Sequence, residues 1–204
     1  MFWALDVDTP PVAASVARYA CLLGDALLDG YLRQPHVTLD VCGFPSRQPL
    51  HGDEFGPELL ARQLAALRLA RPGPFSIGIG EADSFRSAPY LTVLDTAGGV
   101  AALRRCLAID GAHRLLGDYV PHVTIGLYAR SLVFSAIRER LVAGRYDGLV
   151  FPVEHLSLMG YAPAEIGGQL RCLADYRLAS GDWRWHDAAS ACSLDFLRDG
   201  TPES

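Results

Sequence analysis

Hydrophobic and polar positions along this chain follow two periods, the two-residue period of strands and the period of three to four residues typical of helices. In the first half, this pattern predicts strands at 1–6, 36–42 and 75–81 and helices at 12–28 and 57–70. In the second half, it predicts strands at 90–95, 122–128 and 149–159 and helices at 99–109 and 131–143. A further strand is predicted at 169–179, and a loop at 44–56, where glycine and proline are frequent.

The two predicted halves have the same order of elements. Each half also carries a leucine–aspartate pair before its first helix, at Leu5-Asp6 and at Leu94-Asp95. We interpret this as an internal duplication of a strand–helix–strand–helix–strand unit. The predicted fold is therefore α+β and bilobal, with antiparallel-rich sheets around a central cleft. We expect a single two-lobed domain over 1–186, with halves at about 1–83 and 84–179, and a C-terminal tail at 187–204.

The clearest match between the halves is a repeated pentapeptide, PHVTL in the first and PHVTI in the second. Side chains two apart on a strand point to the same face, so His36 pairs with Thr38 and His122 with Thr124. Each histidine can exchange a proton near neutral pH, and each threonine hydroxyl can hydrogen-bond an anion. Because the halves are duplicated, we expect both histidines to converge on one ligand and to supply an acid–base pair.

Metal binding is the main alternative for paired histidines, because zinc sites add further nitrogen or sulfur ligands and oxygen-chemistry sites add carboxylates. In a regular strand Asp40 would share the face of His36, but its counterpart in the second copy is Gly126. The two copies therefore do not both offer a carboxylate, and we expect no metal. Cys42 would also share that face, but no Cys–His–acid arrangement in the sequence supports a nucleophile.

Composition narrows the possible chemistry. Half of the 204 residues are apolar, which is enough for a sizeable core, and the net charge of -5 argues against coating nucleic acid in bulk. That charge is compatible with binding one nucleotide or one RNA terminus. All 18 basic residues are arginine, so lysine Schiff bases, lysine-linked nucleotidyl intermediates and Walker-type phosphate loops are excluded. A long-side-chain phosphate clamp must therefore use arginine.

The remaining sequence signals indicate a cytoplasmic protein without a disulfide framework, a membrane span or a dinucleotide site. Five scattered cysteines without a CxxC pair indicate neither a disulfide framework nor a zinc knuckle. The N-terminus does not have the pattern of a signal peptide, and no apolar run approaches the length of a membrane span. No glycine-rich dinucleotide motif is present. We expect no cofactor and no membrane association, and a monomer is favoured.

The paired motifs, the opening strand from Phe2 to Asp6 and Gly43 after the first motif resemble the two-histidine (2H) phosphoesterase superfamily. This group includes proteins named 2′-5′ RNA ligases and the 2′,3′-cyclic nucleotide phosphodiesterases, and the resemblance covers about 1–179. It implies a metal-independent enzyme that hydrolyses the 2′,3′-cyclic phosphate of a small nucleotide or an RNA terminus. It also implies the reverse reaction, in which RNA ends are joined by a 2′-5′ bond.

The motif residues take definite roles under this resemblance. One histidine of the pair His36 and His122 is the general base and the other the general acid, and near-symmetry leaves open which is which. Thr38 and Thr124 bind the non-bridging phosphate oxygens. Two other interpretations stay open, a non-catalytic protein that binds a nucleotide or RNA end on the same fold, and a metal-dependent hydrolase.

The chain departs from many relatives, which carry an arginine close to the position of Leu127; the nearest basic residue downstream is Arg130. In a regular strand Tyr128 would share the face of His122 and could replace that contact. The candidate substrate-binding residues are therefore Tyr128, Arg130, Arg86 and Tyr31. Arg33 also lies near a motif strand, and Tyr119 could stack on a base or form a hydrogen bond at the rim.

Four histidines lack any repeated context and are predicted to have no role in the site. They are His51, His113, His155 and His186. The cluster Trp183-Arg184-Trp185 is predicted to cover an apolar surface.

Overall fold

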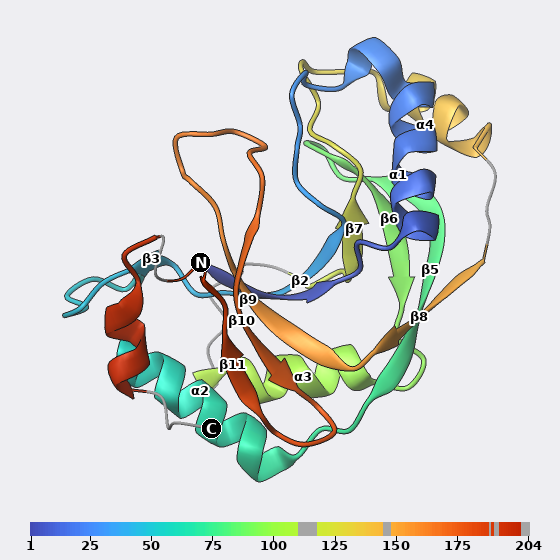
Figure 1. Cartoon of the computed structure of the whole chain (residues 1–204). Helices are drawn as coiled ribbons and strands as arrows, with labels where there is room; N and C mark the ends of the chain where they lie inside the picture. The colour runs from blue at the N-terminus through green and yellow to red at the C-terminus, as the bar shows by residue number, and fades with distance from the viewer. Residues whose placement is uncertain (110–117, 145–147, 188, 190–191, 201–204) are drawn as a thin grey trace.

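A computed structural model describes residues 1–109, 118–144, 148–187, 189 and 192–200 (Figure 1). Within these ranges the chain forms two antiparallel sheets and four helices. The predicted α+β fold with antiparallel sheets is therefore confirmed. His113 lies outside the described residues. No helix in the described part of the chain is long and apolar enough to cross a bilayer.

The larger sheet has five strands in the order β11-β10-β9-β1-β2. Their bounds are β1 Phe2–Asp6, β2 His36–Val41, β9 His155–Gly160, β10 Arg171–Arg177 and β11 Trp183–Trp185. The first strand alternates, so that Trp3 and Leu5 enter the main core while Phe2 and Ala4 pack on the opposite face. Strand β2 is an edge strand, and it carries the first His-x-Thr motif.

The smaller sheet has four strands in the order β7-β6-β5-β8. Their bounds are β5 Phe75–Ser84, β6 Pro89–Leu94, β7 His122–Thr124 and β8 Leu149–Val153. Strand β7 carries the second motif and is also an edge strand. A short parallel pair, β3 (Phe44–Pro45) and β4 (Glu54–Phe55), occupies the segment predicted as a loop.

The helices are α1 (Pro10–Leu23), α2 (Pro57–Ala70), α3 (Gly99–Leu107) and α4 (Phe134–Val142). Proline stands at the start of α1 and α2, where its fixed φ suits the first helical turn and no backbone donor is lost. Helix α1 packs against α4 beside the smaller sheet, and α2 against α3 below the larger one (Figure 1). Helix α1 ends at Leu23 rather than at the predicted residue 28, because Gly24 takes a positive φ of 51°.

Each sheet contains strands from both halves of the sequence. Strand β5, from the first half, pairs with β6 and β8, and β9, from the second half, pairs with β1 (Figure 1). The single strand predicted at 149–159 is in fact two strands, because the chain leaves the smaller sheet after Val153 and enters the larger one at His155. The halves 1–83 and 84–179 therefore do not each form one sheet.

The C-terminal segment also differs from the predicted tail. The 3-10 helix Asp195–Gly200, η3, packs against α2, and Leu197 is fully buried in the core. Strand β11, which was not predicted, adds Trp183 to the core, so the tryptophan cluster does cover apolar surface. The described residues 195–200 thus pack on the domain rather than forming a peripheral tail.

Trp3 is one of the largest fully buried side chains of the main core. Its side chain is fully buried, and its ring centroid is 5.6 Å from that of Trp183. The indole Nε1 donates to Oε1 of Gln63 at 2.8 Å, and Nε2 of Gln63 donates to the carbonyl of Leu107 at 3.0 Å. Strand β1 is thereby connected to α2 and α3 by buried polar contacts whose partners are all satisfied.

Candidate functional site

The two motif strands lie next to each other. Strand β2 forms the edge of one sheet, β7 forms the edge of the other, and the two edges are in contact. His36 and His122 are close enough for a charge on His122 to lower the pKa of His36. Tyr31, from the segment before β2, lies close enough to Thr124 on β7 for that side chain to lower the pKa of Tyr31 against the larger, opposing effect of burial. The fold thus brings the two motif strands side by side, and their convergence on one ligand stays a prediction.

Both histidines make the same hydrogen bond. Nδ1 of His36 contacts the carbonyl of Gln34 at 2.7 Å, and Nδ1 of His122 contacts the carbonyl of Val120, also at 2.7 Å. A carbonyl oxygen only accepts hydrogen bonds, so Nδ1 must carry the proton in each ring. In the neutral form Nε2 is then the unprotonated nitrogen. Two imidazoles with the same tautomer, each fixed by the residue two before it, therefore present Nε2 for proton transfer.

The surroundings of both rings favour the neutral form. Burial lowers the pKa of His36 below 6.5, and the nearby positive charges of Arg33 and His122 lower it further against the opposing effect of Asp6. Burial also lowers the pKa of His122. The His122 ring packs edge-on against Phe85, with the centroids 4.8 Å apart. Both rings therefore favour the neutral form more than a free imidazole does, and a bound anion would act in the opposite direction.

A β-bulge in β2 changes which residues share the histidine face. Ala4 pairs with Thr38 but Trp3 pairs with Asp40, so Leu39 is an extra residue in β2. Asp40 therefore lies on the side of buried Trp3. The predictions that Asp40 and Cys42 share the face of His36 are wrong, because they assumed a regular strand.

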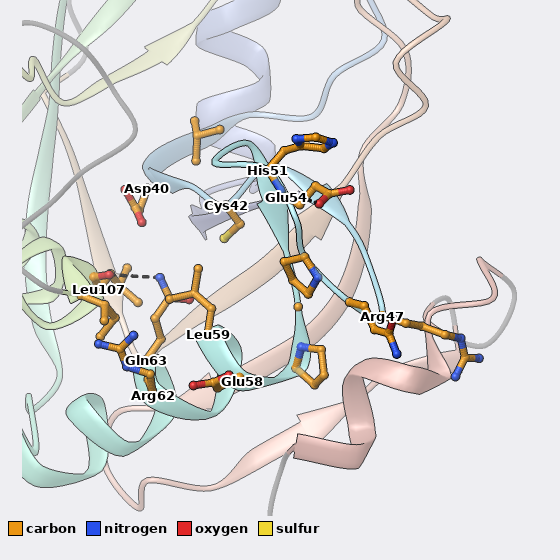
Figure 2. Close-up of a pocket in the computed structure, with 16 residues that line it drawn as sticks. Asp40, Cys42, Arg47, His51, Glu54, Glu58, Leu59, Arg62, Gln63 and Leu107 are labelled. Carbon is orange, nitrogen blue, oxygen red and sulfur yellow. Dashed lines mark hydrogen bonds between the residues drawn. The ribbon is translucent and has the colours of Figure 1, made fainter.

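Figure 2 shows where these two side chains lie instead. They line a separate cavity of about 670 Å³ that contains neither motif histidine nor motif threonine. Its wall also includes Gln63 and Leu107, which are joined by the hydrogen bond drawn in the figure. The carboxylate nearest to His36 along the sequence of β2 is thus directed away from the motif site.

Side chains from elsewhere in the chain bind the backbone carbonyls at the bulge. The Tyr119 hydroxyl donates to the carbonyl of Thr38 at 2.9 Å, and the Arg104 guanidinium donates to the carbonyl of Leu39. That guanidinium lies 3.5 Å from the centroid of the Tyr119 ring. Tyr119 stands three residues before His122, so these contacts connect the first motif to the second. The sequence suggested a rim hydrogen bond for Tyr119 as one alternative, but gave no sign of Arg104.

A cavity of about 670 Å³ opens beside His36 and Thr38, a volume in the range of small-molecule sites. Its wall includes three aromatic side chains and two arginines, namely Phe2, Phe44, Tyr161, Arg33 and Arg171. The Arg33 guanidinium lies 4.3 Å from the Tyr161 ring centroid. Its Nε is buried without a hydrogen-bond partner among the described residues. Arg33 is therefore well placed to meet an anion at the histidines.

The four substrate-binding candidates lie at different distances from the motifs. Tyr31 contacts Thr124 directly. The Tyr128 hydroxyl is 2.7 Å from the Ser84 hydroxyl, and β7 ends at Thr124, so the predicted strand face shared with His122 does not extend to Tyr128. Arg130 forms an exposed ion pair with Asp25 at 2.8 Å.

Arg86 is exposed in the turn between β5 and β6, next to the Phe85 that packs on His122. Of the arginines predicted to lie near the motifs, Arg33 both lines the cavity beside His36 and lowers the pKa of His36.

Several solved structures share this fold, and three of them illustrate the similarity. The TT0787 protein of Thermus thermophilus is 19% identical, with a TM-score of 0.56, over 87% of this chain and 96% of that one. A structure described as a phosphoesterase is 16% identical, with a TM-score of 0.51, over 88% and 98%. Escherichia coli LigT complexed with ATP is 17% identical, with a TM-score of 0.52, over 88% and 96%.

No curated protein gave a significant match to the chain. The family model described as the 2′-5′ RNA ligase superfamily matches residues 8–165, which include both motifs and the strands that carry them. With its fold and this match over most of its length, the chain belongs to the 2′-5′ RNA ligase superfamily of 2H phosphoesterases.

Proposed function

We propose that this protein is a metal-independent phosphodiesterase that opens 2′,3′-cyclic phosphates of nucleotides or RNA ends. The observation that carries the proposal is the matched pair of imidazoles on adjacent edge strands, each with Nδ1 bonded to a backbone carbonyl. Family membership supports the reaction class. Shape and composition of the neighbouring cavity support a ligand with a base and a phosphate, since aromatic side chains stack on bases and arginine suits phosphate.

In the proposed reaction, the cyclic phosphodiester lies between the two Nε2 atoms. One neutral imidazole removes a proton from water, and the water oxygen forms a new bond to phosphorus. The bond from phosphorus to one ribose oxygen breaks, and the other, protonated imidazole donates its proton to that leaving oxygen. The product is a 2′-phosphate, and exchange of the two roles gives 2′-5′ ligation. Each proton transfer contributes typically ~10²–10⁴ in rate.

Hydroxyl and guanidinium groups complete the proposed site. Thr38 and Thr124 donate hydrogen bonds to the non-bridging oxygens, where negative charge grows in the transition state. Tyr31 lies beside Thr124 and is near enough to orient its hydroxyl. Arg33 supplies the positive charge that many relatives obtain from an arginine after the second motif. Its buried, unpartnered Nε provides a donor for the phosphate.

The test is turnover of 2′,3′-cyclic mononucleotides and of a short RNA with a cyclic phosphate end, in buffer containing excess EDTA. We expect turnover to a 2′-phosphate, detected by phosphorus NMR, that is unchanged by the chelator. Saturable binding without turnover would favour the non-catalytic protein that binds a nucleotide or RNA end. Loss of turnover in EDTA, restored by added metal, would favour a metal-dependent hydrolase.

The rate should show a bell-shaped dependence on pH with its maximum on the acidic side of 6.5. Activity requires one neutral and one protonated imidazole, so kcat/KM peaks midway between the two free-protein pKa values. Burial holds the pKa of both His36 and His122 below 6.5, and the midpoint must therefore also lie below 6.5. Measuring kcat/KM from about pH 4.5 to 9 tests this. A flat profile, or a maximum above about pH 7, would contradict the two-histidine scheme.

A further inference from the structure

A second cluster of chemically active side chains lies on the larger sheet, away from the motifs. It consists of Cys172 and Asp175 on β10 and His186 just after β11. Nε2 of His186 is 2.7 Å from Oδ2 of Asp175, and Sγ of Cys172 is 3.4 Å from Oδ1 of the same carboxylate. One sulfur, one nitrogen and one oxygen atom thus lie within 4.8 Å of one another.

A β-bulge brings these side chains together. Cys172 pairs with Met159 but Ala174 pairs with Leu158, so Leu173 is an extra residue in β10. In a regular strand, residues three apart such as Cys172 and Asp175 point to opposite faces. The bulge places both on the same face, as bulges next to functional sites commonly do when they redirect a side chain. The backbone is therefore irregular at the point where the cluster requires it.

The donor set is typical of a zinc-type site. Thiolate, imidazole and carboxylate are the three protein ligands that zinc uses, and magnesium and calcium prefer oxygen alone. The Ser157 hydroxyl donates to Oδ1 of Asp175 at 2.6 Å and so orients the carboxylate, as the outer partners of metal ligands do. The three residues are half-buried, which leaves water access to a fourth position.

We propose that Cys172, Asp175 and His186 bind one divalent transition-metal ion, with zinc the best match to this donor set. Ions of this class favour four ligands, and water completes the set. His186, for which no role was predicted, is one of the three ligands. Because His186 follows β11 and the other two ligands stand on β10, the ion would join the end of β11 to β10.

This site is separate from the motif histidines. Asp175 pairs with Ser157, Ser157 with Ala4 and Ala4 with Thr38, so the four residues form one row across one face of the sheet. Three strand spacings separate the ends of the row, roughly 14 Å. The ion is therefore too far away to coordinate a phosphate held by the motifs, and the inference does not depend on the proposed function.

Metal binding at this cluster must release a proton. Cysteine binds zinc as the thiolate, so the thiol proton of Cys172 has to leave when the ion binds. The ion displaces that proton to solvent, and the contacts of Cys172 and His186 with Asp175 are replaced by bonds to the metal. Calorimetry in two buffers with different heats of ionisation counts the released protons.

The experiment uses the whole chain, treated with chelator and dialysed, and titrated with zinc by calorimetry and with cobalt by absorption. We expect one ion per chain and a thiolate-to-cobalt charge-transfer band in the near ultraviolet. Magnesium should give no heat of binding. C172S, which retains the side-chain volume, should abolish the band. H186A should weaken zinc binding by more than about 100-fold, because even loss of an outer-shell partner typically costs 10–100-fold.

The matched control is C21A, which removes an exposed cysteine outside the cluster. It should leave both the cobalt band and the zinc affinity unchanged. The inference is overturned if the unsubstituted chain binds no stoichiometric zinc, if the cobalt complex lacks a thiolate band, or if C172S and H186A bind as tightly as C21A. Because the readouts are binding and absorption, they are unaffected by whether cyclic phosphates are substrates.

Discussion

Replacing either motif histidine by alanine should lower kcat for 2′,3′-cyclic nucleotides by about 10²–10⁴-fold, the usual contribution of one positioned acid or base. His36→Ala and His122→Ala remove the two Nε2 atoms that the matched backbone hydrogen bonds present to the site. KM should change much less, because the threonine hydroxyls and Arg33 still hold the phosphate. Steady-state kinetics at the pH optimum of the unchanged protein provide the measurement.

The double variant gives a sharper test than either single one. Acid and base act in the same displacement, so their effects should not multiply, and the double variant should be little slower than the worse single variant. His51→Ala is the matched control, since His51 is exposed and lies outside the motifs. If His36→Ala and His122→Ala turned over substrate as fast as the unchanged protein, the reaction would have to occur elsewhere on the molecule.

Trp3→Ala should destabilise the fold more than other single truncations in the core, by about 3–5 kcal/mol. The change removes a fully buried indole from the contact with Trp183 and leaves a large cavity. It also removes the donor to Gln63, whose buried amide oxygen then loses its partner. For a domain of this size, each kcal/mol lowers Tm by about 2–4 °C, so the expected decrease is roughly 6–20 °C.

Trp185→Ala provides the comparison for that measurement. Trp185 is only partly buried on the short edge strand β11, and it should lose clearly less stability. Both variants are compared by urea unfolding and by thermal scans. An equal decrease in the free energy of unfolding for the two variants would contradict the larger contribution expected of Trp3.

Local signals made much of the fold predictable. Helix α2 was predicted with the observed bounds, 57–70, because Pro57 starts it and a proline-rich turn follows it. The repeated motifs indicated two equivalent strands and, with the opening strand, the family to which the chain belongs. These features depend on neighbouring residues, so one sequence is sufficient to read them.

Features that depend on pairing between distant strands were not predictable. The bulge at Leu39 is visible only in the register between β1 and β2, and it reversed the expected orientation of Asp40 and Cys42. Strand β7 ends at Thr124, so the strand face expected to join Tyr128 to His122 does not extend that far. Arg104 reaches the first motif from a helix 65 residues later in the chain, a contact that periodicity does not encode.

The pairing of β5 and β9 with strands from the other half of the sequence affects how the protein unfolds. In the smaller sheet the inner strand β5 comes from the first half and pairs with β6 from the second. In the larger sheet the inner strand β9 comes from the second half and pairs with β1 from the first. Neither half therefore keeps all of its backbone hydrogen-bond partners without the other. A fragment ending near residue 84 would contain the core residues Ile77 and Ile79 of β5 but would lack the neighbouring strands β6 and β8. Melting should accordingly be one concerted event, in which the two imidazoles lose their common geometry at the moment when the whole molecule opens.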